Sequence, residues 1–525
     1  MENLLSIKEA SKWVTEHYGK KTDPSQISYL MQYGHLRKIG NNSNTKVPLE
    51  DLRKYYDSNV NNLEKKWKKH LGEDLNWKLS FDEYSEKERT KHVHRLHPYK
   101  GKFIPQLVEY FLDGHLNDFK KEVFFQPGDI VLDPFCGSGT TLVQANEIGI
   151  NAIGIDVSEF NSLISNIKVQ KHDILRLNTE INRITQLLSE FIYNSASVKF
   201  EEKLLEELNR FNNKYFPSPD FKYEVRNLNT NEWQYGKDKE VEFITIFNSL
   251  IDKYKIEVLQ DSDNTFIEKW YLKPIRKEID FIQQLIKDID DEDTRQVIEI
   301  ILSRTVRSCR ATTHSDLATL KKPIAQTYYC HKHYKICKPL FSIFSWWQRY
   351  SQDTIKRLSE FDYLRTNTYQ ICLTDDSRTI DLFDSLKKIN SVFGKQLQNK
   401  KIKGIFSSPP YVGLIDYHEQ HAYAYDLFKY KRQDKLEIGP LFKGRGKEAR
   451  DSYIEGISKV LLNCKKYLAD DYHVFLVAND KFNLYPIIAE KAGMEIINQF
   501  KRPVLSRVEK DKSAYSETIF QMKEI

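Results

Sequence analysis

The chain has 525 residues, of which 40% are hydrophobic and 29% charged, a composition typical of globular proteins rather than of collagen, coiled coils or disordered chains. At about 150 residues per domain, this length allows two to four domains. The tightest apolar stretch, 474–478, is far shorter than the ~18 residues of a membrane span, and the polar N-terminus does not fit a signal peptide. Six cysteines in so long a chain do not make a disulfide framework, so we expect a cytoplasmic protein without a membrane partner.

The net charge is only +6, but the basic residues are concentrated in two segments. Residues 304–349 hold nine Lys and Arg against one acid, Asp316, and residues 429–450 hold eight against three acids. Such local surpluses are expected of a protein that binds a polyanion. A solvated charged face is the alternative interpretation.

Residues 1–60 predict a small helical unit. The apolar spacing indicates helices over 6–18 and 25–33, a short strand at 46–48 and a closing helix over 49–56. This layout resembles the winged helix of excisionase/MerR-type DNA-binding domains, in which the second helix enters the major groove. The resemblance makes Gln26 and Tyr29 candidate DNA contacts, and a small helical adaptor is the alternative.

From about residue 100, strand-like apolar runs alternate with helical segments. The runs expected to be strands are 130–135, 151–157, 369–374, 404–407, 473–478, 495–500 and 517–522. This alternation predicts an α/β fold whose mostly parallel sheet is covered on both faces. About 200 residues between the second and third strands predict a helical insertion. The expected segments are a DNA-binding domain (1–60), a charged linker helix (61–94), the first part of the sheet domain (95–168), the insert (169–366) and the second part of the sheet domain (367–525).

A glycine-containing turn follows the first of these strands. Asp133 ends the strand, and a helix begins at about Thr141. Glycines let a ligand approach the backbone closely, and the helix N-terminus offers N–H donors. Asp156, 23 residues after Asp133, ends the second strand, where an acid suits a ribose diol. The turn is neither a GxGxxG nor a phosphate-binding GxxxxGK[ST] loop, and an acid before the glycines suits a cationic ligand.

Asp-Pro-Phe-Cys-Gly-Ser-Gly-Thr-Thr, residues 133–141, resembles the S-adenosylmethionine motif of amino-group (N4-cytosine/N6-adenine) DNA methyltransferases of bacterial restriction-modification type. The resemblance implies a Rossmann-like methyltransferase sheet, here with a large helical insert and an N-terminal winged-helix-like domain. It also implies that S-adenosylmethionine is the cofactor. Further cofactor residues come from the segment before the first strand and from the acid after the third. The implied set is Lys102, Phe103, Asp133, Pro134, Phe135, Cys136, Gly137, Gly139, Thr140, Thr141, Asp156 and Asp376.

The fourth expected strand ends in Ser408-Pro409-Pro410-Tyr411. Two prolines lack N–H groups and fix an extended backbone, so carbonyl groups are left to accept hydrogen bonds from an exocyclic amine. Tyr411 offers a flat face for a base that has left the helix stack. The tetrapeptide resembles the catalytic motif of the same family, in which a first-position serine is commoner in cytosine-N4 enzymes. Beyond it, His418, Glu419 and His421 are interpreted mainly as cleft-lining and packing groups.

These motifs predict a site-specific DNA methyltransferase that acts on N4 of a flipped cytosine in a restriction-modification or related system. Double-stranded DNA is the expected partner, and a cognate restriction endonuclease is a further candidate. N6-adenine methylation is the alternative. An RNA or protein amide methyltransferase and a non-catalytic DNA-binding regulator are kept as further alternatives.

The basic segments supply the remaining candidates. Three arginines recur every third residue and are expected along one side of a helix, and lysines interleave with aromatic residues after them. The candidate DNA contacts are Arg304, Arg307, Arg310, Lys332, Lys335, Lys443 and Arg445. The cysteine and histidine pattern also makes a candidate zinc set of Cys309, Cys330, His333 and Cys337, with buried free thiols beside surface histidines as the alternative.

Overall fold

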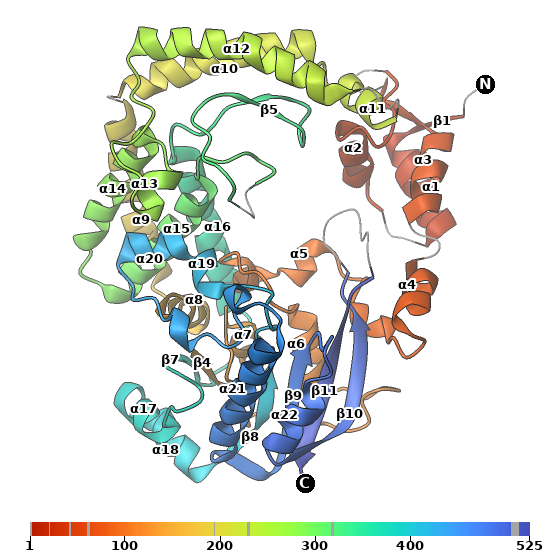
Figure 1. Ribbon diagram of the computed structural model, residues 1–525, viewed down its shortest axis with the longest axis vertical. Coiled ribbons are helices and arrows are strands. Elements are labelled where there is room, and N and C mark those ends of the chain that lie inside the picture. Colours follow the sequence, from red (N-terminus) through yellow and green to blue (C-terminus); the bar gives the residue numbers. More distant parts are fainter. Residues whose placement is uncertain are drawn as a thin grey trace. The chain divides into compact units, whose positions relative to one another are not determined.

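The computed structural model describes residues 3–19, 22–40, 44–59, 63–193, 195–227, 231–316, 320–505 and 514–525 (Figure 1). These form two compact units: a first unit of Met1–Lys66, Leu187–Phe281 and Ser308–Phe344, and a second of Trp67–Gln186, Ile282–Arg307 and Ser345–Ile525. The division into five segments stays a prediction. In the described parts of the chain, every helix is too short or too polar to span a bilayer.

The N-terminal part of the first unit has the helices and strand expected from its apolar spacing. Its elements are β1 (Leu4–Ser6), α1 (Ile7–Tyr18), α2 (Pro24–Gln32), β2 (Lys46–Pro48) and α3 (Leu49–Asn59). Capping boxes begin α1 at Ser6 and α2 at Asp23. β1, which was not expected, pairs antiparallel with β2. Buried side chains that include Val14, Ile27 and Leu52 form one core among these elements. The winged-helix assignment stays a prediction.

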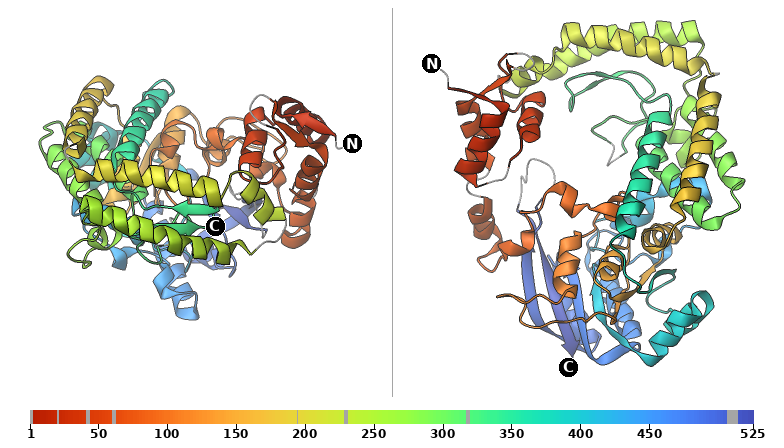
Figure 2. Two further views of the ribbon diagram at one scale, coloured as in Figure 1. Left: turned by 90° about the horizontal axis from the view of Figure 1, so that it is seen from above. Right: turned by 180° about the vertical axis from the view of Figure 1, so that it is seen from behind.

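The rest of the first unit is helical except for one hairpin. Its elements are α10 (Ala196–Tyr215), α11 (Asp220–Asn227), α12 (Glu232–Tyr254), α13 (Phe266–Trp270) and the antiparallel strands β5 (Tyr328–Cys330) and β6 (Lys335–Cys337). The long helices α10 and α12 run side by side (Figures 1 and 2). Phe200, Phe211, Phe243 and Phe247 are buried between them, with edge-to-face ring contacts.

The second unit is built on a seven-stranded sheet in the order β10-β11-β9-β8-β3-β4-β7. The strands are β3 (Ile130–Asp133), β4 (Asn151–Asp156), β7 (Gln370–Thr374), β8 (Ile402–Ser407), β9 (Leu468–Ala478), β10 (Met494–Pro503) and β11 (Ser516–Glu524). All seven were expected from the sequence. β11 is antiparallel to both of its neighbours, and the pairs from β9 to β7 are parallel. The expected mostly parallel sheet is therefore confirmed.

Helices cover both faces of this sheet. On one face, Ile130 and Leu132 of β3 pack in a core with Ile457 of α21 (Lys447–Lys465) and Ile488 of α22 (Tyr485–Lys491), and both helices lie over the strands in Figure 1. On the other face, Phe111 of α6 (Pro105–Leu112) contacts Phe475 at 4.9 Å between ring centroids, and α6 is seen over the strands from behind in Figure 2. Burial on both faces explains the nearly continuous apolar runs of the central strands.

The other helices of the second unit are mostly short. They are η2 (Trp77–Ser80), α5 (Glu86–Arg89), η3 (His92–Arg95), α7 (Thr140–Glu147), α8 (Glu159–Val169), α17 (Leu382–Ile389), α18 (Ser391–Asn399), α19 (Tyr417–Gln420), α20 (Ala422–Phe428), η4 (Asp434–Leu436) and η5 (Leu441–Lys443). Some helices run across the chain positions that divide the units: α4 (Leu63–Leu71), α9 (Ile174–Tyr193), α14 (Lys273–Lys287), α15 (Glu292–Ser308) and α16 (Phe344–Asp362).

Candidate active site

The candidate site lies where the parallel strands of the second unit end. β3 pairs with β4 on one side and with β8 on the other, so the chain leaves β3 at a point where the strand order reverses. Ligands of open α/β sheets bind beyond the carboxyl ends of the strands at such a point. Asp133, Asp156 and Ser407 end β3, β4 and β8 there.

A pocket at this edge encloses about 890 Å³ of space without atoms, part of it open to solvent. Most of the implied cofactor residues line it. They are Lys102, Phe103, Pro134, Phe135, Cys136, Gly137, Thr140, Asp156 and Asp376. Two residues of the implied catalytic motif, Ser408 and Pro410, line the same pocket. Asp133, Gly139 and Thr141 lie outside its lining.

Asp133 holds two strands together. Its Oδ1 accepts hydrogen bonds from Ser407 Oγ at 2.5 Å and from the Phe135 N–H at 3.2 Å. The side chain is buried, and this burial raises the pKa of Asp133 to about 6 although the hydrogen bonds act in the opposite direction. Asp133 thus joins the turn after β3 to the end of β8. The sequence could not reveal this link, because Ser407 is 274 residues away.

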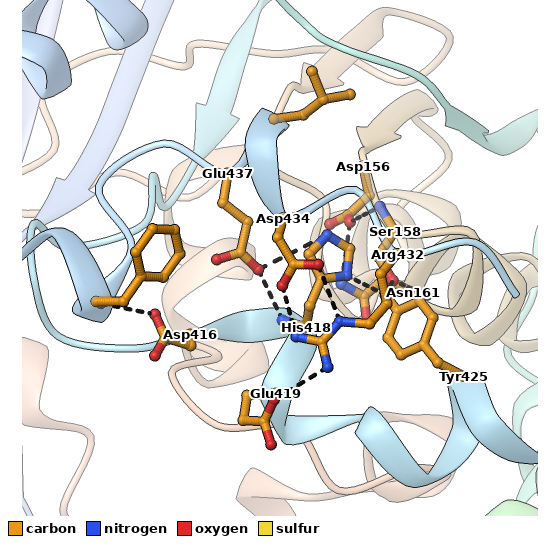
Figure 3. Close-up of polar contacts among 12 residues, drawn as sticks. Asp156, Ser158, Asn161, Asp416, His418, Glu419, Tyr425, Arg432, Asp434 and Glu437 are labelled. Carbon is orange, nitrogen blue, oxygen red and sulfur yellow. Dashed lines mark hydrogen bonds and ion pairs between the residues drawn. The ribbon is translucent and has the colours of Figure 1, made fainter. Parts of the chain in front are cut away.

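Asp156 fixes the glycine turn. Its Oδ2 accepts a hydrogen bond from the Gly137 N–H at 2.9 Å. Its Oδ1 accepts from the Ser158 N–H at 2.9 Å and from Asn161 Nδ2 at 3.1 Å (Figure 3). Burial raises the pKa of Asp156 to about 6, against the effect of these donors. Because Gly137 has φ +54° and a Cβ there would lie 3.1 Å from the Tyr99 ring, a side chain at this position would be strained and crowded.

Gly139 serves helix packing. It precedes α7 with φ +74°, and an added Cβ would lie 2.9 Å from Ser165 Cβ on α8. Thr141, one residue into α7, is fully buried. Gly139 and Thr141 lie outside the lining of the pocket, and their implied contact with the cofactor stays a prediction.

The segment before β3 contributes more to the pocket than the implied pair. Lys102 Nζ donates a hydrogen bond to the His94 carbonyl, and the Phe103 ring packs edge-on against Phe406 at 5.5 Å. Tyr99, which the sequence analysis did not select, also lines the pocket and stacks on Tyr417 at 6.0 Å. Its position inside the same His97–Pro105 segment was the signal that could have identified it.

Asp376 follows β7 and is paired with a nearby arginine. Arg378 Nη2 lies 2.7 Å from Asp376 Oδ2, and its Nε lies 2.8 Å from Oδ1. Burial alone would raise the pKa of Asp376, but the hydrogen bonds from Arg378 outweigh it and lower the pKa. Asp376 is therefore an ionised acceptor with its charge compensated.

A buried polar network on the opposite wall includes an acid that the sequence analysis missed. Ser158 Oγ lies 2.6 Å from the Tyr425 hydroxyl, which also contacts His418 Nδ1. The His418 N–H donates to Glu437 Oε1 at 2.8 Å (Figure 3). Burial raises the pKa of Glu437 to about 7. Ser158, His418 and Glu437 all line the pocket, so the interpretation of His418 as a cleft-lining group fits its position.

Glu419 and His421, which were expected to line the cleft together with His418, lie outside the lining of the pocket. His421 is buried and stacks on Tyr99 at 5.8 Å between ring centroids, whereas Glu419 is exposed and pairs with Arg432 at 3.1 Å. Glu437 could not be selected from the sequence, because it lies in a charged loop that is separated along the chain from His418, the residue that it contacts.

The implied catalytic motif is held by the β10–β11 hairpin at one edge of the sheet. The Tyr411 hydroxyl donates to Glu517 Oε1 at 2.7 Å. Glu517 Oε2 pairs at 3.1 Å with Arg502 Nη1, and Arg502 Nε donates to the Leu79 carbonyl at 3.0 Å. Arg502 is only 4% exposed. The end of the β10–β11 hairpin therefore anchors the tyrosine of the motif after β8.

The expected DNA contacts fall into two groups by exposure. Arg304 is 4% exposed, its Nη1 donates to Thr354 Oγ1 at 2.7 Å, its Nη2 pairs with Asp353, and its guanidinium lies 4.4 Å from the Tyr350 ring centroid. A buried and paired guanidinium has no surface to offer a phosphate, so we withdraw Arg304 from the DNA-contact proposal. Arg310 follows the end of α15 at Ser308, so the expected row of three arginines along one helix is wrong at its last member.

The remaining contacts stay proposals. Arg307 is half-buried near the end of α15. Gln26 and Tyr29 are exposed on α2, where Tyr29 stacks on Tyr33 at 4.3 Å and Gln26 also caps its own helix. Lys332 and Lys335 are exposed on the β5–β6 hairpin, and Lys443 and Arg445 are exposed in and after η5.

The candidate zinc set changes in one member. Cys330, His333 and Cys337 do lie together, and the residue that joins them is His314. Cys309 is buried outside this group. The sequence analysis chose Cys309 by residue type, and only the folded chain shows that His314 is the neighbour.

Comparison with known proteins gives the family. A family model described as DNA methylase matches residues 11–166. The chain is 46% identical over 526 aligned residues to the type II methyltransferase M.MjaII of Methanocaldococcus jannaschii, covering 99% of this chain and 97% of that protein. The chain belongs to the amino-group DNA methyltransferase family. This family implies S-adenosylmethionine as the cofactor.

Other methyltransferases match with lower identity or over less of the chain. The type II methyltransferase M.BsoBI of Geobacillus stearothermophilus is 24% identical over 80% of this chain and 66% of its own length. A tRNA (guanine(10)-N2)-dimethyltransferase of M. jannaschii is 32% identical over 114 residues, 19% of this chain and 30% of that protein. No solved structure matches the chain significantly.

The pocket fits the chemistry of this cofactor. S-adenosylmethionine carries positive charge on its sulfonium and ammonium groups, and Asp156 and Glu437 are acids in the pocket wall that accept hydrogen bonds from uncharged N–H groups. Their raised pKa values reflect desolvation that a bound cation would relieve.

Proposed function

We propose that the chain is a site-specific DNA methyltransferase that modifies N4 of a cytosine flipped out of the duplex. The observation that carries this proposal is that Ser408 and Pro410 line the same pocket as Gly137 and Asp156. A base whose amine meets the motif after β8 would thus lie next to the residues implied to hold the cofactor.

The chain's part in the reaction is to orient the amine. Bound S-adenosylmethionine supplies an electrophilic methyl group whose leaving group is a neutral thioether. Ser408 offers a hydroxyl oxygen as one acceptor. Because Pro409 and Pro410 have no N–H, they leave backbone carbonyl groups to accept a hydrogen bond from the amine. An amine that donates its two hydrogens to such oxygens has its lone pair turned away from them and toward the methyl donor. Orientation of this kind accounts for much of a rate enhancement without a general base.

The serine at the head of the motif supports N4-cytosine over N6-adenine, because the resemblance ties serine to cytosine-N4 enzymes and Asp or Asn to adenine-N6 enzymes. C5 methylation of cytosine needs a nucleophilic thiolate. Cys136 lines the pocket, but burial raises the pKa of Cys136 well above its ordinary value, so its thiol stays protonated and a poor nucleophile.

The loop around η5 is a proposed DNA-contacting surface that contacts the segment after the motif. Arg445 Nε donates to the Gly413 carbonyl at 3.1 Å, and the Phe442 N–H donates to Asp416 Oδ1 at 3.2 Å, so the loop is fastened to the segment after Tyr411. Phe442 is 63% exposed beside the exposed Lys443. A basic group would contact phosphate, and an exposed apolar ring is the kind of side chain that enters an opened base step.

A methyltransferase acting on an RNA amine is the second candidate function, favoured by the short match to the tRNA guanine-N2 enzyme. The match to a type II methyltransferase covers nearly the whole chain, including residues 1–60. We therefore take DNA as the substrate, and a cognate endonuclease as a candidate partner.

The test is methylome sequencing after expression in a host without DNA methylation, with Ser408→Ala as the matched control. We expect N4-methylcytosine at one sequence motif with the wild-type chain and none with Ser408→Ala. N6-methyladenine would keep the family and reverse the base. Unmodified DNA, together with methyl transfer to tRNA in vitro, would replace the proposal with the RNA function. Unmodified DNA and RNA, with cofactor and DNA bound, would favour a regulator.

A further inference from the structure

Two cysteines and two histidines gather at the β5–β6 hairpin of the first unit. Cys330 ends β5, His333 lies in the turn, Cys337 ends β6, and His314 precedes the hairpin in the chain. One ligand atom from each residue lies within 4.8 Å of the others. Cys330 Sγ is 3.8 Å from His314 Nδ1, and Cys337 Sγ is 3.6 Å from His333 Nδ1.

Two of the six separations among these ligand atoms match those of a tetrahedral zinc site. With Zn–S of about 2.3 Å and Zn–N of about 2.0–2.1 Å, neighbouring ligand atoms of a tetrahedron are about 3.3–3.8 Å apart. The observed sulfur-to-nitrogen distances fall in that range before any metal draws the ligands together. Two thiolates and two imidazoles are also the ligand types that zinc prefers.

The surroundings hold the ligands in place. The Tyr328 hydroxyl lies 2.8 Å from His314 Nδ1, a contact that coordination of zinc by this nitrogen would replace. Asn212 of α10 receives the Ile336 N–H at 3.0 Å and donates to the Ile336 carbonyl at 3.0 Å, which places β6 against the helix. The Tyr329 N–H donates to Glu240 of α12 at 2.7 Å.

Apart from its contacts with α10 and α12, the hairpin has only a small core of its own. Each strand has three residues, and the apolar cluster inside consists of Tyr328, Cys330 and Cys337 with Ile324 packed against it. A two-stranded hairpin of this size is marginal in water, and small elements are commonly completed by a metal.

We propose that His314, Cys330, His333 and Cys337 bind one structural Zn²⁺ ion. Four protein ligands fill the tetrahedron and leave no position for water or substrate, so the ion is structural rather than catalytic. Its role is to close the loop from His314 to Cys337 and to fix the turn that carries the exposed Lys332.

A second group of possible metal ligands lies in the second unit and consists of His92, His94 and Glu147. It differs from the first group because a lysine already pairs with its carboxylate. The Lys91 ammonium pairs with the Glu147 carboxylate, and His92 Nε2 lies 2.9 Å from Glu147 Oε1. A cation already beside the carboxylate disfavours a metal ion there. We therefore expect one zinc per chain.

The test is the metal content of the full-length protein, purified without chelators and measured by inductively coupled plasma mass spectrometry. We expect about one zinc per chain in the wild type and less than a tenth of that in Cys337→Ser and His314→Ala. The chain offers two matched controls. Cys309→Ser removes a buried thiol outside the cluster, and His331→Ala removes an exposed turn histidine that pairs with Glu232. Both controls should retain the zinc.

If His314→Ala fails to fold, His314→Cys still tests the site, because a third thiolate in place of the imidazole should retain zinc. Replacement of zinc by Co²⁺ should give the visible absorption of tetrahedral cobalt with thiolate ligands. A wild-type protein without bound zinc would overturn the proposal. Loss of zinc in Cys309→Ser, with retention in His314→Ala, would overturn the ligand set.

Discussion

The contact between Tyr411 and Glu517 allows the hydroxyl and the ring of the tyrosine to be tested separately. The hydroxyl donates to Glu517, whose other oxygen pairs with the buried Arg502. Tyr411→Phe removes the hydrogen bond and keeps the ring. A hydrogen bond to a charged group contributes about 1.5–3 kcal/mol at most, but Glu517 keeps Arg502, so we expect the lower end of that range and a loss of about tenfold in methylation rate.

Tyr411→Ala removes the ring as well. Stacking on an aromatic ring is worth about 1–3 kcal/mol per base, and if the ring contacts the base only after it has left the stack, this energy appears in the rate. We expect a further loss of about 5- to 150-fold. Affinity for duplex DNA should change little in both variants.

The assay is single-turnover methylation with saturating cofactor and enzyme in excess over DNA, beside binding measured by fluorescence anisotropy. Equal rates for Tyr411→Phe and Tyr411→Ala would refute the stacking role of the ring. A wild-type rate in Tyr411→Phe would refute the role of the contact with Glu517.

Further predictions concern the cofactor, the arginines and the glycine turn. Burial raises the pKa values of Asp156 and Glu437 to about 6 and about 7. A ribose diol at Asp156 and a cationic group at Glu437 both bind the ionised carboxylate, so calorimetric affinity for S-adenosylmethionine should rise from pH 5.5 to 7.5, by up to about tenfold per pH unit per group below its pKa. A flat profile would contradict this role. Arg304→Ala should lower stability by about 1–3 kcal/mol, because it removes a buried guanidinium and its hydrogen bond to Thr354, while Asp353 keeps its ion pair with Arg357. It should not change the salt dependence of DNA binding. Lys443→Ala should reduce the slope of DNA affinity against salt by about one unit and leave the thermal midpoint unchanged. A reduced salt slope in Arg304→Ala, with no loss of stability, would show that Arg304 contacts DNA after all. Gly137→Ala should weaken cofactor binding at least tenfold in calorimetry, because φ is +54° and the new Cβ would crowd an aromatic ring. Unchanged affinity would show that the turn can accommodate a side chain at this position.

The strands and the part of the pocket formed by the turn after β3 could be predicted because they depend on local patterns. Buried parallel strands appear as short apolar runs, and the turn after β3 carries its chemistry within nine consecutive residues, 133–141. The contribution of Asp133 could not be predicted in the same way, since its partner Ser407 is brought beside it by strand pairing.

The same limit explains the other corrections. The spacing of the arginines predicted that Arg304 would lie on the surface. Spacing contains no information on Asp353, 49 residues later, which pairs with Arg304 in the folded chain. His314 and Glu437 gave no local signal, and each gains its neighbours only when distant segments pack together.

The central claim is the identity of the methylated base, and one measurement tests it directly. Purified protein would be incubated with unmethylated genomic DNA and S-adenosylmethionine carrying a deuterated methyl group, and the digested nucleosides would be separated and weighed by mass spectrometry. The account predicts label in N4-methyldeoxycytidine, lost in Ser408→Ala. Label in N6-methyldeoxyadenosine or in 5-methyldeoxycytidine would contradict it.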